Sequence, residues 1–98
     1  MKVTLQIINS PDDGKEFQLT KRENYIGRVS GNEIIIPNDN QISRRHSKVE
    51  VKNQEIWLED MDSRNGTFVN NERLEEPYLL SPQEIFRVGK TYLQVIIT

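Results

Sequence analysis

The stretch KVEVKNQEIWLE, residues 48–59, decides the fold class of this chain. Apolar residues occupy every second position on both sides of a short polar break at Asn53 and Gln54. Strict alternation of this kind is typical of a β-strand with one buried face, and a polar break between two such runs is typical of a turn. The stretch therefore predicts two short strands joined by a tight turn.

The same alternation recurs along the chain. It is present in VTLQII at 3–8, in KEFQLT at 15–20 and again at 93–97, and the apolar run EIII at 33–36 is stopped by Pro37. Stretches rich in glycine, asparagine, aspartate and serine separate these runs every 8 to 12 residues. About ten short strands separated by turns predict an all-β fold, an antiparallel sandwich or barrel.

One segment also matches a helix start. Residues 81–84, SPQE, have the pattern of a capping box with proline at the first helical position. However, the following residues, IFRVG at 85–89, alternate and reach glycine within five positions. We therefore expect a single turn that leads into a strand.

Composition restricts the class of protein. Ninety-eight residues predict one domain, spanning 1–98, and the absence of cysteine excludes a disulfide framework or a thiolate metal site. No run approaches the ~20 apolar residues of a membrane-spanning helix, and the first residues do not resemble a signal peptide. We expect a soluble cytoplasmic chain with no membrane partner. The net charge of −2 argues against a nucleic-acid partner.

The sequence offers little for catalysis. Ser43 and the only histidine, His46, are three residues apart, but no nucleophile-elbow motif surrounds the serine. The carboxylates are scattered, so we expect no enzyme, no metal site and no cofactor. VGKT at 88–91 lacks the upstream glycine of a phosphate-binding P-loop, because Glu84 stands there, and predicts a hairpin turn. NGT at 65–67 is a glycosylation acceptor, which matters only in a secreted protein.

Three loop-like segments carry groups suited to an oxyanion: 27–28 (GR), 43–46 (SRRH) and 63–70 (SRNGTFVN). Arginine forks, a hydroxyl and turn amides are the donors that bind phosphate in proteins. If the segments lie at one end of a sandwich, these donors converge on one site. Each also has an ordinary explanation, since a lone Arg28 is a solvated surface charge and Asn65-Gly66 is a common type I′ turn.

Taken together and in this order, GR, SRRH and NGTFVN resemble the motifs of the forkhead-associated (FHA) domain family. The resemblance covers essentially the whole chain. It implies a sandwich of about eleven strands, of the FHA and SMAD type, with binding loops at one end. It also implies a phosphothreonine-peptide-binding module of Ser/Thr kinase-linked signalling, commonly one part of a larger signalling protein. The sequence does not determine the oligomeric state, for which we expect a monomer.

The resemblance assigns phosphopeptide binding to six residues: Arg28, Ser43, Arg44, Arg64, Asn65 and Asn70. Arg28 would clamp the phosphate, Ser43 would donate its hydroxyl, and Arg44 would add a side-chain or backbone contact. Asn65 would bond the peptide backbone beside the phosphothreonine. Asn70 would support this loop or bind the backbone further along. Arg64 stands where many members carry threonine and would extend the positive rim.

Structural support of the site is assigned to Gly27, His46, Gly66 and Thr67. We expect the His46 ring to turn inward, bond across the loops and hold Ser43 and Gly27 in register, while Arg45 points away from Arg44. Asn40 and Gln41 are close to where the family reads the third residue after phosphothreonine. Both are neutral, which predicts no strong demand for an acidic residue there.

One alternative stays open from the sequence alone. A domain of the same fold could act as a phosphate-independent docking, regulatory or self-association module that uses a sheet face. The presence of Arg28, Ser43 and Asn65 together favours the phosphothreonine module, because a domain without phosphate binding need not keep all three.

Overall fold

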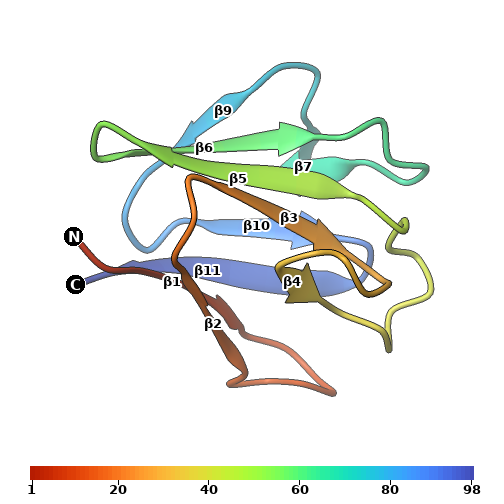
Figure 1. The fold of residues 1–98 in the computed structure, drawn as a ribbon. Helices are drawn as coiled ribbons and strands as arrows, with labels where there is room; N and C mark the ends of the chain where they lie inside the picture. The colour runs from red at the N-terminus through yellow and green to blue at the C-terminus, as the bar shows by residue number, and fades with distance from the viewer.

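The computed structural model describes all of residues 1–98 as two β-sheets packed face to face, with no helix (Figure 1). It confirms the all-β prediction and contains eleven strands. Two of them have only two residues each, too few to show alternation in the sequence. The strands are β1 (Val3–Ile7), β2 (Glu16–Leu19), β3 (Glu23–Gly27), β4 (Ile34–Ile35), β5 (Ser47–Lys52), β6 (Glu55–Asp60), β7 (Thr67–Val69), β8 (Glu72–Arg73), β9 (Tyr78–Leu80), β10 (Ile85–Val88) and β11 (Thr91–Ile97).

The strands form a six-stranded sheet in the order β2-β1-β11-β10-β7-β8 and a five-stranded sheet in the order β4-β3-β5-β6-β9. The pairing is antiparallel with one exception, so the predicted antiparallel sandwich is confirmed. Strand β4 runs parallel to β3, with Ile26 opposite Ile34. The loop 28–33 turns back beside the end of β3, and the chain then starts β4 in the same direction.

The opening stretch forms the β5–β6 hairpin as predicted. Val49 lies opposite Leu58, and the turn residues Asn53 and Gln54 have φ of 53° and 65°. Two consecutive residues with positive φ match the twist of the flanking strands and join them tightly. The inward residues of both sheets form one core of 17 buried apolar side chains: Val3, Leu5, Ile7, Leu19, Ile26, Ile34, Ile36, Ile42, Val49, Ile56, Leu58, Val69, Leu80, Phe86, Val88, Leu93 and Val95.

The segment 81–84 forms a turn and not a helix, as expected. The Ser81 amide donates to Glu84 Oε1 at 2.8 Å, and the Glu84 amide donates to the Ser81 carbonyl at 3.1 Å. Gln83 has a φ of 69°, outside the helical region, so the chain leaves the turn and enters β10.

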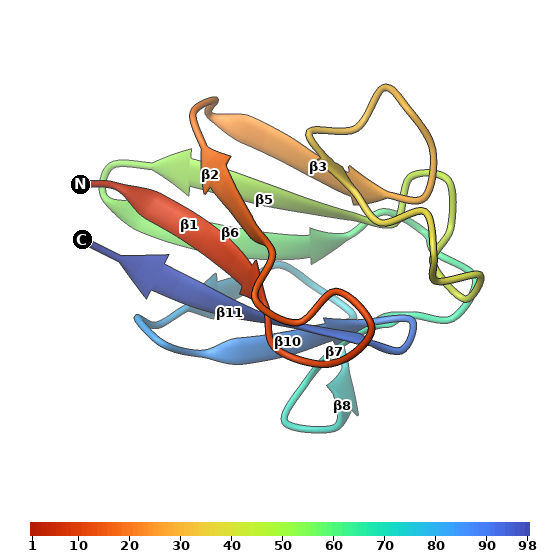
Figure 2. The same ribbon diagram turned by 90° about the horizontal axis from the view of Figure 1, so that it is seen from below.

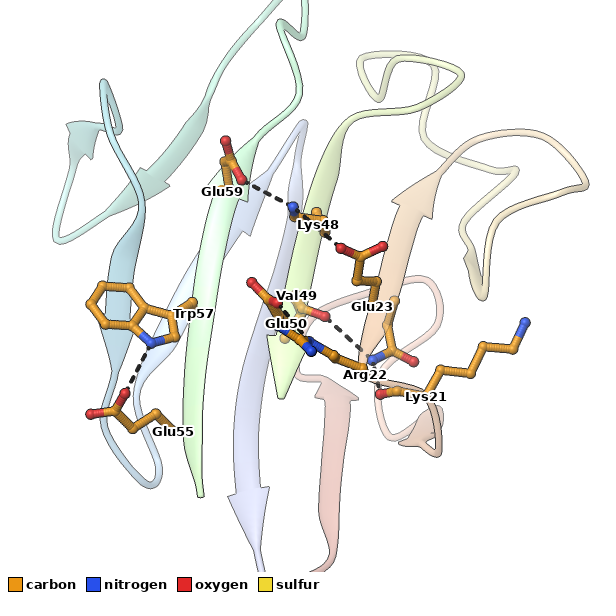
Figure 3. A network of polar contacts seen from close by, with 10 residues as sticks. Lys21, Arg22, Glu23, Lys48, Val49, Glu50, Glu55, Trp57 and Glu59 are labelled. Atoms are coloured by element: carbon orange, nitrogen blue, oxygen red, sulfur yellow. Dashed lines mark hydrogen bonds and ion pairs between the residues drawn. The ribbon is translucent and has the colours of Figure 1, made fainter. Parts of the chain in front are cut away.

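Ion pairs occupy the outer face of the five-stranded sheet (Figure 3). Lys48 lies 3.3 Å from Glu59 and 3.9 Å from Glu23, and Arg22 lies 3.0 Å from Glu50. Burial alone would lower the pKa of Lys48, but the adjacent carboxylates outweigh it and raise the pKa above its ordinary value. Surface pairs of this kind contribute about 0 to 1 kcal/mol each, so core burial is the main source of stability.

The loops 28–33, 36–46 and 61–66 gather at one end of the sandwich, and both chain termini lie at the other end (Figures 1 and 2). This arrangement brings the three candidate segments of the sequence to the same end. The chain has no helix of the length and apolar character needed to cross a membrane.

Leu58→Ala should lower the free energy of unfolding by about 2 to 5 kcal/mol, because Leu58 is fully buried between the sheets. Leu79→Ala is the matched control, since Leu79 lies in the neighbouring strand with 44% of its surface exposed. Urea unfolding at neutral pH measures both variants. Equal losses in the two variants would contradict this account of the core.

Candidate functional site

The three loops meet on the short segment 41–43. Asn65 Nδ2 donates to the Gln41 carbonyl at 2.8 Å, and Arg28 Nε donates to the Ile42 carbonyl at 3.0 Å. The Arg28 amide also donates to the Ser43 carbonyl at 3.1 Å. Arg28 is 15 positions from Ser43 and 37 positions from Asn65 in the sequence. These hydrogen bonds nevertheless hold all three residues around the segment 41–43.

Ser43 has its hydroxyl proton available. The Arg64 amide donates to Ser43 Oγ at 3.0 Å, so the hydroxyl oxygen acts as an acceptor toward the third loop. A hydroxyl that accepts one bond still carries its own proton for a second partner. Ser43 is only half-buried, so that proton can be donated to an anion bound at the surface.

His46 joins two of the loops from inside the protein. The ring is fully buried, and Nδ1 accepts the Ser43 amide proton at 3.0 Å. Nε2 must therefore carry the ring proton, which it donates to the Gly66 carbonyl at 2.8 Å. The inward orientation and the bond across the loops agree with expectation, but the second partner of the ring is Gly66 and not Gly27.

The surroundings of His46 favour its neutral form. Burial lowers the pKa of His46 below its ordinary value of 6.5, and the bond to Gly66 opposes this effect only in part. A protonated ring would also lose the acceptor at Nδ1 that holds the Ser43 amide. The geometry of Ser43 therefore depends on a neutral imidazole.

Position 27 requires glycine, because two other chain segments approach its backbone closely. A Cβ at Gly27 would overlap the Arg44 carbonyl and the side chain of Asn32. Asn32 is buried and donates from Nδ2 to the Arg44 carbonyl at 2.7 Å and to the Val29 carbonyl at 2.9 Å. Sequence analysis missed Asn32, because its stretch SGN has only the pattern of a turn.

Thr67 belongs to a buried polar cluster beneath the third loop. Its Oγ1 donates to Asp60 Oδ1 at 2.6 Å and lies 2.7 Å from Ser47 Oγ. Ser63 donates to Asp60 from both its hydroxyl and its amide, and Ser63 Oγ accepts the Gly66 amide at 2.9 Å. Burial alone would raise the pKa of Asp60, but the hydrogen bonds from Ser63 and Thr67 outweigh it and lower the pKa.

Asp39 anchors the 41–43 segment on the β10–β11 hairpin, and it too was missed from the sequence. Its carboxylate accepts the Gln41 amide at 3.0 Å, the Lys90 amide at 2.7 Å and the Thr91 hydroxyl at 2.8 Å. Gly89 leaves room for this carboxylate, since a Cβ there would lie 2.7 Å from Asp39 Oδ2. The VGKT motif is thus a hairpin turn, as predicted, and its amide and hydroxyl groups hold a neighbouring loop.

The positive side chains of the loop end differ in their partners. Arg44 and Arg64 are exposed and Arg28 is half-buried, and none of the three forms an ion pair with a carboxylate. Arg45 instead stacks 3.9 Å from the centre of the Tyr25 ring and donates to the Gly31 carbonyl. The structure therefore brings Arg28, Arg44 and Arg64 to the site, while Arg45 packs against the first loop.

Comparison with known proteins identifies the family. A family model of the FHA domain matches residues 24–89. The chain belongs to the FHA domain family. It is 34% identical over 93 residues to the FHA domain-containing protein FhaA of Mycobacterium tuberculosis, a match that covers 95% of this chain and 17% of FhaA.

Solved FHA domains share the whole fold. One, from an analysis of phosphothreonine-dependent FHA domain interactions, is 32% identical with a TM-score of 0.89 and covers 100% of this chain and 98% of that one. Another, the FhaA FHA domain in complex with the intracellular domain of Rv3910, is 33% identical with a TM-score of 0.84, over 95% and 98% of the two chains. The FHA domain is a module that binds phosphothreonine peptides.

Asn70 lies apart from the other site residues of this FHA domain. Asn70 and Asn71 form the turn between β7 and β8, with φ of 52° and 65°. The Asn70 side chain is exposed and forms no hydrogen bond to the three loops. The structure thus gives Asn70 a place in a tight hairpin, and it brings together Arg28, Ser43, Arg44, Arg64 and Asn65 without it.

The free energy of unfolding of the FHA domain should fall as the pH drops below about 6.5. The folded-state pKa of His46 lies below 6.5, so its contribution is fully present above about pH 6.5 and is lost as the pH falls through the folded pKa. His46 is the only histidine, so a loss of stability in this pH range can be attributed to its side chain. Urea unfolding between pH 7.5 and 5 measures the loss.

The matched control is His46→Gln, which has no group that titrates in this window. The variant should be less stable at neutral pH, because one of the two loop bonds is lost, and its stability should change less between pH 7.5 and 5. Parallel pH profiles for wild type and variant would contradict the assignment.

Proposed function

We propose that this FHA domain binds phosphothreonine-containing segments of other proteins at the loop end of the sandwich. The main support is that the three loops contact one another at residues 41–43. There Arg28, Ser43 and Asn65 are held by hydrogen bonds within one small region. These bonds order the loops before any ligand arrives, which reduces the entropy cost of binding.

The phosphate would be bound by two arginines and one hydroxyl. Phosphothreonine carries about −1.5 to −2 charges at pH 7 and three acceptor oxygens. Arg28 uses Nε on the Ile42 carbonyl, so its two terminal nitrogens remain for a phosphate, and Ser43 supplies its free hydroxyl proton. Arg44 is exposed beside Ser43 and would add a second charge-assisted bond.

The peptide backbone would be held by Asn65. Its Nδ2 already donates one proton to the Gln41 carbonyl, which orients the amide and leaves one N–H and the carbonyl oxygen for a ligand. An amide that both donates and accepts suits an extended peptide. Arg64 would extend the positive rim, and Asn70 would support the β7–β8 hairpin.

The partner would be a protein phosphorylated on threonine by a Ser/Thr kinase, with the domain acting as a monomer in the cytoplasm. The proposal includes no cofactor and no nucleic acid. The complex of the FhaA FHA domain with a partner protein domain supports a protein ligand for this chain, which is 33% identical to that domain.

Isothermal titration calorimetry tests the proposal. The ligands are three peptide pools with identical flanking residues that carry phosphothreonine, phosphoserine or unmodified threonine at the centre. We expect binding to the phosphothreonine pool alone, weaker at higher salt, because screening reduces attraction between partly exposed charges. A folded domain that binds none of the pools would instead indicate a phosphate-independent docking module.

Arg28→Gln should weaken phosphothreonine binding by about 2 to 5 kcal/mol, because it removes one partner of a hydrogen-bonded charge pair. Arg22→Gln is the matched control, since Arg22 lies just before the opposite end of the same strand, β3, paired with Glu50. Calorimetry with the phosphothreonine pool measures both, and thermal melts verify folding. An equal loss of affinity in the two variants would show that only the overall charge matters, and it would contradict the assignment of Arg28 to the phosphate site.

A further inference from the structure

The loop end carries more positive charge than one phosphothreonine requires. Five arginines lie in it or against it, Arg28, Arg44, Arg45, Arg64 and Arg73, and none forms an ion pair. All four ion pairs of the protein involve other residues. Arg28 and Arg44 are proposed to match the about −1.5 to −2 charges of one phosphothreonine, and Arg45 is stacked on Tyr25, so Arg64 and Arg73 remain for another anion.

Arg73, in β8, was not singled out from the sequence. Its side chain lies along the turn 63–66: a Cβ at Gly66 would be 2.7 Å from Arg73 Nε and 3.0 Å from its Cδ. Nη2 of Arg73 lies 3.5 Å from the Ser63 carbonyl, at the long limit of a hydrogen bond. The absence of a side chain at Gly66 therefore makes room for the exposed guanidinium of Arg73 against this turn.

Arg64 belongs to the same turn and connects it to the phosphate donors. Its amide is bound to Ser43 Oγ, the hydroxyl proposed to contact the phosphate, and its side chain is exposed. The turn 63–66 thus has one unpaired arginine within it and a second one lying along it. Asn65, which is proposed to hold the peptide backbone, lies in the same turn between Arg64 and Gly66, and Arg73 lies against Gly66.

We propose that Arg64 and Arg73 form a second anion subsite, which binds another acidic group on the same peptide close to the phosphothreonine. The subsite rests on the proposed function of the loops. A second phosphate fits it best, because two guanidinium forks match its charge and its three oxygens. A carboxylate of aspartate or glutamate is the weaker ligand of the same chemistry.

Two other arginines show that unpaired charge alone does not define this subsite. Arg45 is stacked on Tyr25, and Arg87 lies 4.2 Å from the centre of the Phe68 ring and donates to the Gly89 carbonyl. Each of these guanidinium groups already has an aromatic face and a carbonyl as partners. Arg45 therefore provides a control of equal charge near the site.

Fluorescence anisotropy with the whole chain tests the subsite. The reference peptide carries one phosphothreonine among neutral residues. Two further series place either aspartate or a second phosphothreonine at each of the four positions on either side. At one or more positions, aspartate should tighten binding by about 1.5-fold to fivefold, as expected for a partly exposed charge pair. The second phosphate should tighten it more, because it carries more charge.

The decisive readout is the ratio of the dissociation constants of the singly and doubly anionic peptides. In Arg64→Gln/Arg73→Gln this ratio should fall close to one. In Arg45→Gln, which removes one positive charge outside the subsite, it should stay near the wild-type value. A similar fall in Arg45→Gln would show a general electrostatic effect and overturn the subsite.

The two proposals fail in different ways. If the reference peptide binds wild type but no flanking acidic group tightens binding, the second subsite is wrong and the phosphothreonine site stands. If the reference peptide itself does not bind to the folded domain, the proposed function is wrong. Thermal melts of each variant separate loss of binding from loss of folding.

Discussion

A neutral imidazole enclosed in the protein joins the two loops that carry most of the candidate site. His46 accepts the Ser43 amide proton at Nδ1 and donates to the Gly66 carbonyl from Nε2. Only the neutral ring with its proton on Nε2 can do both. Ser43 in turn accepts the Arg64 amide, so the His46 ring and the Ser43 hydroxyl together link the second and third loops.

Hydrogen bonds to two carboxylates, the buried Asp39 and the half-buried Asp60, also hold the loops in place. Asp39 accepts bonds from its own loop and from the β10–β11 hairpin, and Asp60 accepts them from Ser63 and Thr67. Irregular segments contain backbone amides with no strand partner, and a buried amide without a partner is costly. The two carboxylates accept hydrogen bonds from amides and hydroxyls of the loops and of the β10–β11 hairpin. These bonds keep the loop end ordered without regular secondary structure.

Charge is divided between two regions of the molecule. Acidic and basic side chains on the outer face of the five-stranded sheet pair with one another, as with Lys48 between Glu59 and Glu23. The arginines of the loop end have no such partners. The chain therefore combines a net charge of −2 with a local positive field, which favours anionic groups at the loop end.

Local patterns in the sequence predict the all-β class and the β5–β6 hairpin, since a period of two is a property of consecutive side chains. The sequence also predicted the turn at 81–84, and the order of its motifs singled out Arg28, Ser43 and Asn65. The parallel β3–β4 pair and the roles of Asn32, Asp39 and Arg73 were decided only by the tertiary structure. Asp39 meets Lys90 across 51 residues, and Arg73 lies along its turn only because Gly66 leaves space. Such contacts arise from how the two sheets bring loops together, which no local pattern encodes.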